Sequence, residues 1–406
     1  MGYQPLARKC RPQTFDEVIA QNHITQTLKN AILSEKMTHC FLFAGPRGVG
    51  KTSVARIFAK SINCKDGPTG TPCNQCSNCI EITKGYSIDI LEIDGASNTG
   101  VDNIRELREN VQYLPAKTRY KVYIIDEVHM LSNSAFNALL KTLEEPPNHV
   151  IFILATTDPH KIPETIISRC QRFHFKRIPY ALICEKLAEI VQESEITVEE
   201  SSLHIIARAA QGSLRDAQVL LDQVIAYCSN EIHYTDVLEI LDIVDRQIYL
   251  DLTDAILKRD GRRCIEILES AYNQGFPVRE FYRGLLEHFR DVAVLSISQD
   301  TSDLLHLPDN ELRLLEKQAQ SVQYEDIKIY MEKIISKESE IYHSSSPKII
   351  LEAIIFDMVA YKSISSFTHL VEKLTALEKR ILNLLSNQPE HHALDKFSEP
   401  VCERTT

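Results

Sequence analysis

The residues with the clearest chemical potential form a glycine-rich loop of the kind that binds phosphate. The loop and its flanks comprise Gly45, Pro46, Arg47, Gly48, Val49, Gly50, Lys51, Thr52 and Ser53. Glycines let successive backbone N–H groups turn toward the β- and γ-phosphates of a nucleotide, and the N-terminus of a following helix favours their charge. Lys51 would neutralise the phosphates, and the hydroxyl of Thr52 would ligate Mg²⁺. The loop therefore predicts binding of ATP and Mg²⁺.

The alternative for this loop is a chance match, because short motifs recur in long chains. The loop follows an apolar run at 40–44 and precedes a segment with helical apolar spacing at 52–61. A strand, a loop and a helix in this order form the context that a phosphate loop requires. We therefore interpret the motif as a nucleotide site.

A second nucleotide element ends the apolar run at 122–125, where two carboxylates, Asp126 and Glu127, stand side by side. At the carboxyl end of a buried strand, Asp126 can hold Mg²⁺ through a bound water, and Glu127 can polarise the attacking water. The alternative is a pair of solvated acids at a strand end. With the phosphate loop present, the pair predicts hydrolysis as well as binding.

Four cysteines lie just beyond the phosphate loop, and their spacing is typical of a metal site. They are Cys64, Cys73, Cys76 and Cys79. Two close C-x-x-C steps can surround Zn²⁺ with thiolates, and the bound ion can organise a segment too short for its own core. The alternatives are four reduced thiols or a redox pair, although no thioredoxin-like context surrounds them. Four cysteine ligands predict a closed structural zinc site with no position left for catalysis.

The elements that must position these residues alternate between β-type and helical segments as far as about residue 177. Strands are expected at 40–44, 88–93, 120–125 and 150–155, and helices at 102–113 and 134–143. The strands are mostly apolar, as buried parallel strands are. This pattern predicts an α/β domain at 1–179, containing a zinc module at 64–79, with a parallel sheet covered on both faces.

After residue 179 the β-type runs disappear, and the rest of the chain is expected to be helical. We predict a small helical domain at 180–243, with a helix opening at 212–216, and a larger one at 244–365, with breaks at 261, 275–277 and 344–347. In the segment 366–406, apolar residues recur at steps of four and three, which favours a heptad-like helix. Both a helix packed on its own chain and a short coiled coil fit this spacing, and the end beyond 388 is expected to be loose. The residues of the spacing are Leu370, Leu374, Leu377, Ile381 and Leu384.

Length and composition set further limits. The chain has 406 residues, a formal net charge of −11, 44% hydrophobic and 25% charged residues, and 11 cysteines. The length favours two or three domains, and the acidic charge argues against a whole-surface grip on nucleic acid. No apolar run is long enough for a bilayer, the N-terminus lacks an apolar signal core, and the cysteines outside the cluster are scattered. We expect a cytoplasmic protein with no membrane partner.

Taken together, the motifs resemble those of the AAA+ ATPases of clamp loaders, and within them the gamma/tau subunits of bacterial DNA polymerase III. The resemblance runs from Tyr3 to about Lys362. Besides the phosphate loop and the four cysteines, it depends on RKCRPQTF at 8–15, IDEVHML at 125–131, LKTLEEPP at 140–147, ATTD at 155–158, SRC at 168–170 and GSLR at 212–215. It implies an AAA+ domain with a zinc insertion, a helical lid and a helical collar.

The resemblance also implies roles for three residues. Thr157 would sense the γ-phosphate, and Arg169 would be an arginine finger acting in the neighbouring subunit's site. Arg215 would reach the nucleotide of its own subunit and couple it to the angle of the lid. The alternatives are an ordinary strand-end threonine, a structural salt bridge and a surface arginine, respectively.

In relatives, the N-terminal region holds the adenine and ribose. The corresponding residues are Ala7, Arg11, Pro12, Val18 and Ile19. Apolar walls with backbone contacts suit a base.

For DNA, some relatives carry basic residues just before the helix expected near 102, where this chain has Asn98 and Gly100. Arg105, Lys141 and Lys161 remain candidate phosphate contacts, and solvated surface cations are the alternative for each.

The resemblance implies a motor subunit in a hetero-pentameric ring with related subunits. Such rings use ATP to open a sliding clamp and load it on primed DNA, and some also contact the polymerase core. Two alternatives remain open. One is a structural hub, although the chain ends soon after the collar; the other is a remodelling or branch-migration ATPase, although those lack the cysteine insertion.

Overall fold

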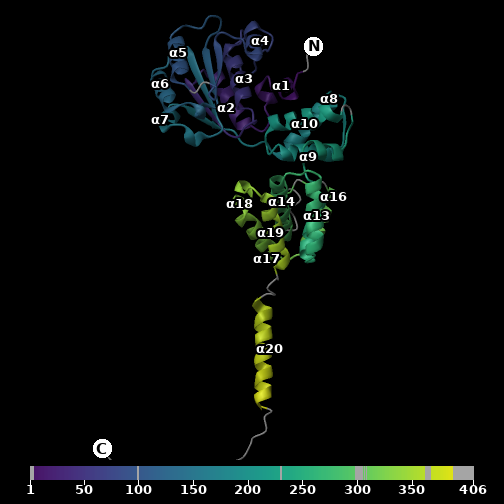
Figure 1. Cartoon of the computed structure of the whole chain (residues 1–406). Helices are drawn as coiled ribbons and strands as arrows, with labels where there is room; N and C mark the ends of the chain where they lie inside the picture. Colours follow the sequence, from purple (N-terminus) through teal and green to yellow (C-terminus); the bar gives the residue numbers. More distant parts are fainter. Residues whose placement is uncertain are drawn as a thin grey trace, which may run out of the picture.

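The computed structural model describes residues 4–97, 100–228, 231–297, 305, 307, 309–361 and 367–386. Within these ranges, only the backbone is described at 101–103, 105, 309–310, 367–372 and 383–386. The chain runs from a sheet domain through a small helical domain and a second helical domain to a final helix (Figure 1).

The first domain is built on a five-stranded parallel sheet in the order β2-β3-β4-β1-β5. The strands are β1 (Cys40–Ala44), β2 (Ile90–Asp94), β3 (Lys121–Asp126), β4 (Val150–Thr156) and β5 (Gln171–His174). β1 shows why both faces are covered: Phe41 and Phe43 enter one apolar core, whereas Leu42 enters the other. Successive side chains of a strand point to opposite faces, so an all-apolar strand needs a helical layer on each side.

The helices of this domain form those two layers. One core takes residues from α2 (Asn22–Leu33) and α3 (Lys51–Asn63), and the other takes residues from α5 (Val101–Val111), α6 (Asn133–Glu144) and α7 (Glu164–Ile167). Shorter elements complete the domain, namely η1 (Phe15–Glu17), α4 (Ser77–Lys84), η2 (Val128–Met130) and η3 (Pro159–Lys161). The predicted α/β fold with a covered parallel sheet is confirmed.

The sequence prediction missed β5. In this edge strand only Phe173 is buried, while its neighbours are polar and wholly or partly exposed. An edge strand that buries one side chain has no apolar run to reveal it. The strand nevertheless matters, because it follows directly on Arg169 and Cys170.

The lid consists of α8 (Tyr180–Glu193), α9 (Glu200–Ala209), α10 (Leu214–Cys228) and α11 (Tyr234–Ile240). The prediction that β structure ends at 179 is wrong in one detail, since β6 (Thr197–Val198) and β7 (Glu231–Ile232) pair in a small parallel sheet. The N-terminal helix α1 (Leu6–Lys9) docks here: Leu6 is buried in the lid core, and its backbone N–H donates to Asp222 Oδ2 at 2.7 Å. The lid therefore also holds the N-terminal segment that precedes the adenine-binding residues.

The collar has one apolar core shared by most of its helices. These are α12 (Arg246–Leu257), α13 (Gly261–Asn273), α14 (Val278–Ile297), α16 (Asp309–Gln320), α17 (Tyr324–Ser336), α18 (Glu338–His343) and α19 (Pro347–Ala360). The breaks between them match the predicted breaks at 261, 275–277 and 344–347.

The final helix, α20 (Phe367–Ser386), extends beyond the collar in Figure 1. Its side chains from 373 to 382 are exposed throughout, including Leu374 and Leu377. The helix is therefore not packed on its own chain along this stretch, contrary to one of the two interpretations of the heptad-like spacing. The side chains of Leu370 and Leu384, and the tail from 387 on, lie outside what the structure describes.

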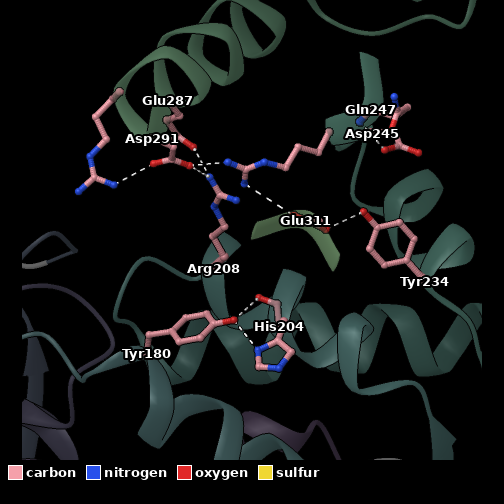
Figure 2. A network of polar contacts seen from close by, with 11 residues as sticks. Tyr180, His204, Arg208, Tyr234, Asp245, Gln247, Glu287, Asp291 and Glu311 are labelled. Carbon is pink, nitrogen blue, oxygen red and sulfur yellow. Dashed lines mark hydrogen bonds and ion pairs between the residues drawn. The ribbon is translucent and has the colours of Figure 1, made fainter. Parts of the chain in front are cut away.

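Lid and collar meet through a network of charges around Asp291 (Figure 2). The Asp291 side chain on α14 is 4% exposed and accepts a hydrogen bond from Arg246 of α12 at 2.6 Å. Arg208 of lid helix α9 approaches the same carboxylate at 3.6 Å. Arg246 also faces Glu311 at 3.7 Å, and Glu311 accepts a hydrogen bond from Tyr234 of the lid at 3.3 Å. A buried carboxylate needs such cationic partners, so the network ties the lid to the collar.

Among the described residues, no helix combines the length and the apolar character that crossing a bilayer requires.

Candidate nucleotide and zinc sites

The phosphate loop connects the carboxyl end of β1 to the first turn of α3. Gly48 and Gly50 take positive φ angles of 73° and 101°. Residues with a side chain rarely adopt such angles. Lys51 is 6% exposed, and its ammonium donates to the carbonyl oxygens of Gly45 at 2.8 Å and Pro46 at 2.7 Å. Burial lowers the pKa of Lys51, and nearby Glu127 and Asp126 oppose this effect. A buried ammonium held only by neutral carbonyls is well placed to take a triphosphate as its counter-charge.

The end of β3 brings the two predicted carboxylates to this loop. Thr52 donates its hydroxyl proton to Asp126 Oδ2 at 2.7 Å, so a hydroxyl and a carboxylate converge at the position expected for Mg²⁺. The donor set, oxygen only, suits this hard cation. Glu127 follows with a left-handed backbone, φ 45° and ψ 45°, an uncommon conformation for a residue with a side chain.

Thr157 lies at the end of β4, the strand next to β3. Its hydroxyl donates to Glu127 Oε2 at 3.0 Å. The structure therefore brings together the residue predicted to activate water and the residue predicted to sense the γ-phosphate.

Sequence reasoning missed His129 at this point. Its Nδ1 lies 3.4 Å from Glu127 Oε2 and 3.1 Å from Thr156 Oγ1. It helps to position the carboxylate of Glu127, together with Thr157. The sequence did offer one signal, because His129 comes two residues after Glu127. On a short helical turn this spacing lets the imidazole ring point back toward the end of β3.

One cavity joins the phosphate loop to the adenine-binding residues predicted from the N-terminus. Gly45, Pro46 and Thr157 do not line it, but the other predicted nucleotide-contacting residues do, namely Ala7, Arg11, Pro12, Val18, Ile19, Arg47, Gly48, Val49, Gly50, Lys51, Thr52, Ser53 and Arg215. Asp126 and Glu127 line it as well. Cys10, Ile178 and Gln218 also line this cavity and were not predicted. Burial lowers the pKa of Arg11, with Arg56 and Arg215 among the nearby cations.

The lid closes one side of this cavity through Arg215. The Arg215 backbone N–H donates to the carbonyl of Gly48 at 3.4 Å. A Cβ atom on Gly48 would lie 1.9 Å from Ser213 Oγ, so only glycine permits this approach of lid and loop. Arg215 also lines a neighbouring cavity together with Arg47, Arg56 and Glu127.

Arg169 lies at the opposite edge of the sheet from these residues. Strands β1 and β5 are parallel, with Phe41 opposite Gln171, so Arg169 precedes the amino end of β5 while the phosphate loop follows the carboxyl end of β1. Five strand residues separate the two edges by about 16 Å at roughly 3.3 Å per residue. Figure 1 accordingly shows α7, which leads to Arg169, on the side of the sheet domain away from α8 and α10. Arg169 does not line the nucleotide cavity of its own chain.

The four predicted zinc ligands converge beside α3. Their sulfur atoms all lie within 4.8 Å of one another, and Cys64 and Cys79 are buried. Thiolates at about 2.3 Å from a tetrahedral Zn²⁺ lie roughly 3.8 Å apart, so this cluster fits the ion after a small contraction. Burial opposes ionisation of Cys76, but backbone N–H donors that include those of Lys65 and Cys79 lower its pKa to about 6. The set of donors therefore fits zinc.

The cysteine cluster is fixed to the sheet domain by hydrogen bonds from one charged and one neutral side chain. Arg119 donates to the carbonyl of Cys64 at 2.6 Å, and Asn78 donates to the carbonyl of Asn63 at 2.8 Å. These contacts lie at the C-terminal end of α3, which ends at Asn63, whereas Lys51 begins the helix. This placement separates the cluster from the phosphate loop by the length of α3.

We expect the purified chain to hold one Zn²⁺, and replacement of Cys76 by Ala to lower the zinc content and the melting temperature. ATP binding should remain, because the phosphate loop is at the other end of α3. Metal analysis and thermal unfolding check both statements, with Cys228→Ala as the matched cysteine control in the lid. A wild-type zinc content well below one per chain would contradict the assignment.

The candidate DNA contacts are only partly described. Lys141 is exposed on α6, and Lys161 is 63% exposed and pairs with Asp158 at 3.2 Å. Asn98 and the side chain of Arg105 lie outside the described residues, whereas Gly100 caps the N-terminus of α5.

The structure has a parallel sheet with a phosphate loop after β1, adjacent carboxylates at the end of β3, a threonine after β4 and a helical lid that lines the same cavity as the loop. This combination defines the class of AAA+ ATPases. Three family models match consecutive parts of the chain. They are those of the DNA polymerase III delta subunit at 20–179, the clamp loader ATPase lid domain at 182–230, and domain III of subunits gamma and tau at 232–374.

Relatives narrow the class further. The chain is 43% identical over 393 residues to DNA polymerase III subunit tau of Bacillus subtilis, covering 95% of this chain and 69% of that protein. It is 42% identical to subunit tau of Escherichia coli, covering 89% and 56%, and 40% identical to subunit gamma of Buchnera aphidicola, covering 89% and 99%. The chain belongs to the gamma/tau family of DNA polymerase III clamp-loader subunits.

A solved structure of the RuvB branch migration motor of Thermotoga maritima is 20% identical with a TM-score of 0.43, covering 61% of this chain and 79% of that chain. This level of likeness carries no argument for the branch-migration alternative. The relatives above favour the clamp loader.

Proposed function

We propose that this chain is the ATP-driven motor subunit of a DNA polymerase III clamp loader, which opens a sliding clamp and loads it on primed DNA. The observation that carries the proposal is the division of the site across the sheet. Loop, carboxylates and sensor gather at one edge, whereas Arg169 lies at the other. Such a subunit completes a neighbour's site rather than its own, so hydrolysis requires a ring.

Within one subunit, each residue has a separable task. Lys51 holds the β- and γ-phosphates, and Thr52 and Asp126 would hold Mg²⁺, which supplies charge neutralisation when bound. Glu127, positioned by Thr157 and His129, takes the proton of the attacking water.

Coupling to movement would occur through Arg215. Arg215 lies in the first turn of α10, and its backbone N–H bonds to Gly48 of the phosphate loop. A contact of Arg215 with the γ-phosphate would therefore change the angle of α10. The Asp291 network then passes a rotation of the lid to the collar (Figure 2). Rigid-body rotation about packed interfaces is a common way to convert ligand contacts into shape change.

The proposed partners are related, non-identical subunits in a pentameric ring, the clamp, primed DNA and, through the holoenzyme, the polymerase core. DNA phosphates would meet Lys141, Lys161 and Arg105, and the N-terminus of α5 would supply a further phosphate contact. A cytoplasmic location agrees with these partners. The Cys64, Cys73, Cys76 and Cys79 cluster would hold Zn²⁺ in a structural role.

The test is ATP turnover by the chain reconstituted with partner subunits, clamp and primed DNA. Turnover should rise strongly when clamp and primed DNA are both present, and Lys51→Ala should abolish nucleotide binding, because the triphosphate loses its buried cation. Lys36→Ala, on the exposed turn after α2, is the control. Turnover that ignores the clamp but responds to four-way DNA junctions would support the branch-migration alternative instead.

A further inference from the structure

Two cysteines outside the zinc cluster, Cys40 and Cys170, form a disulfide. The pairing of β1 with β5 in the sheet brings these two cysteines close together. Since Phe41 lies opposite Gln171 in the parallel β1–β5 pair, the residues one position earlier lie together at the amino edge. Their Cα atoms are 4.6 Å apart, within the range of about 4.4–6.8 Å that a disulfide requires. The register of the strands thus holds the two sulfur atoms in reach of each other in either redox state.

The pair is adjacent to the proposed arginine finger. Arg169 precedes Cys170 directly, and both backbone N–H groups bond back into the turn of α7, to the carbonyls of Ile166 at 3.1 Å and Ile167 at 3.3 Å. With the disulfide formed, the Arg169 guanidinium is bound to its own chain. It donates to Glu144 Oε1 and to the carbonyl of Thr165, each at 2.6 Å.

We propose that Cys40 and Cys170 form a reversible oxidation site that slows ATP hydrolysis in the ring by holding the Arg169 segment on its own subunit. The inference rests on the proposed role of Arg169. A guanidinium that enters a neighbour's site must leave Glu144 and Thr165, and how far it reaches depends on the position of the backbone at 168–170. A covalent bond from Cys170 to a core strand restrains that position, and reduction removes the restraint.

The exposure of the two thiols fixes the order of the chemistry. Cys40 is 3% exposed, whereas Cys170 is partly exposed and therefore meets the oxidant first. The Cys170 thiolate attacks a low-molecular-weight disulfide such as glutathione disulfide, forms a mixed disulfide and releases one thiolate. The Cys40 thiolate then attacks the Cys170 sulfur and releases the second. The two protons lost from the cysteines end on the two released thiols, and a dithiol reductant reverses both steps.

The experiment compares rings assembled from wild-type, Cys170→Ala and Cys228→Ala chains, each after treatment with glutathione disulfide or with dithiothreitol. Cys170→Ala removes both the bond and the site of the mixed disulfide but leaves Arg169 in place. Cys40→Ala serves as a second variant if Cys170→Ala does not fold, and mass analysis then reports any glutathione left on Cys170. Cys228→Ala is the control for a cysteine elsewhere. Alkylation and peptide mass analysis report the Cys40–Cys170 link, and zinc content reports any oxidation of the four-cysteine cluster.

We expect the oxidised wild-type and Cys228→Ala rings to hydrolyse ATP at least about fivefold more slowly than the reduced rings, with zinc retained, and the Cys170→Ala ring to hydrolyse ATP at the same rate after either treatment. Equal rates of the wild-type ring in the two states, failure of the link to form, or an equal response of the Cys170→Ala ring would overturn the inference. A reduced ring carrying Arg169→Ala separates the two hypotheses. If that ring keeps the wild-type rate, the arginine finger itself is wrong, whatever the redox response.

Discussion

A ring whose subunits carry Glu127→Gln should bind ATP and retain it. The change preserves the size of the side chain and the Thr157 hydrogen bond, since the amide oxygen still accepts, but it removes the carboxylate that we propose takes the proton of water. General-base catalysis of this kind contributes about 10²–10⁴-fold, so turnover should fall by that factor. Lys51, Thr52 and Asp126 are untouched, so ATP affinity should stay close to that of the wild type.

The measurement is single-turnover hydrolysis in the assembled ring, together with equilibrium binding of a fluorescent ATP analogue. Glu239→Gln, an exposed glutamate of α11, is the matched control. A Glu127→Gln ring that hydrolyses ATP at the wild-type rate would show that another group accepts the proton, and His129 would be the next candidate. Loss of binding would instead show that Glu127 mainly supports the loop.

Arg169→Ala should leave ATP binding by the isolated chain nearly unchanged, because Arg169 lies at the other edge of the sheet from the phosphate loop. In the ring, hydrolysis stimulated by clamp and DNA should fall by about a thousandfold at each affected site, the effect of losing a planar cation from the transferred phosphoryl group. The ion pair with Glu144 is a surface pair with side chains 34% and 50% exposed. Such pairs contribute at most about 1 kcal/mol, so stability should hardly change.

Mixed rings determine the direction of action. Sites on chains that lack Arg169 but keep Lys51 should recover turnover when the neighbour supplies a normal Arg169. The control is Arg172→Ala, which replaces an exposed arginine three residues further on. This variant should hydrolyse ATP at the wild-type rate. If no mixed ring recovers activity, Arg169 acts within its own subunit or has a structural role.

Most helices and strands, and the residue types of the nucleotide and zinc sites, could be predicted from the amino-acid sequence alone. Lys51 and Thr52 could be predicted because a phosphate loop needs particular groups at fixed spacings between one strand and one helix. Asp126 could be predicted because it ends a second apolar strand. The buried apolar strands β1, β3 and β4 and the breaks of the collar could be predicted for a similar reason, since burial and chain reversal leave local patterns in the sequence. The strand β2 is only partly buried, and its alternating apolar residues were the signal. The four cysteines could be predicted as a metal site because they stand at close C-x-x-C spacings within one short segment.

Contacts between segments that are distant in the chain could be established only from the folded structure. The strand β5 buries one side chain and leaves no pattern in the sequence, yet its pairing with β1 places Cys170 beside Cys40, 130 residues away. The same pairing places Arg169 at the edge of the sheet opposite the phosphate loop. The contact of Gly48 with the lid and the buried charge of Asp291 likewise join segments that are distant in the chain. Local spacing indicates which chemistry a residue type can perform, because it depends on neighbours in the chain. Long-range register and packing determine which other residues it can act with, because they bring distant segments together.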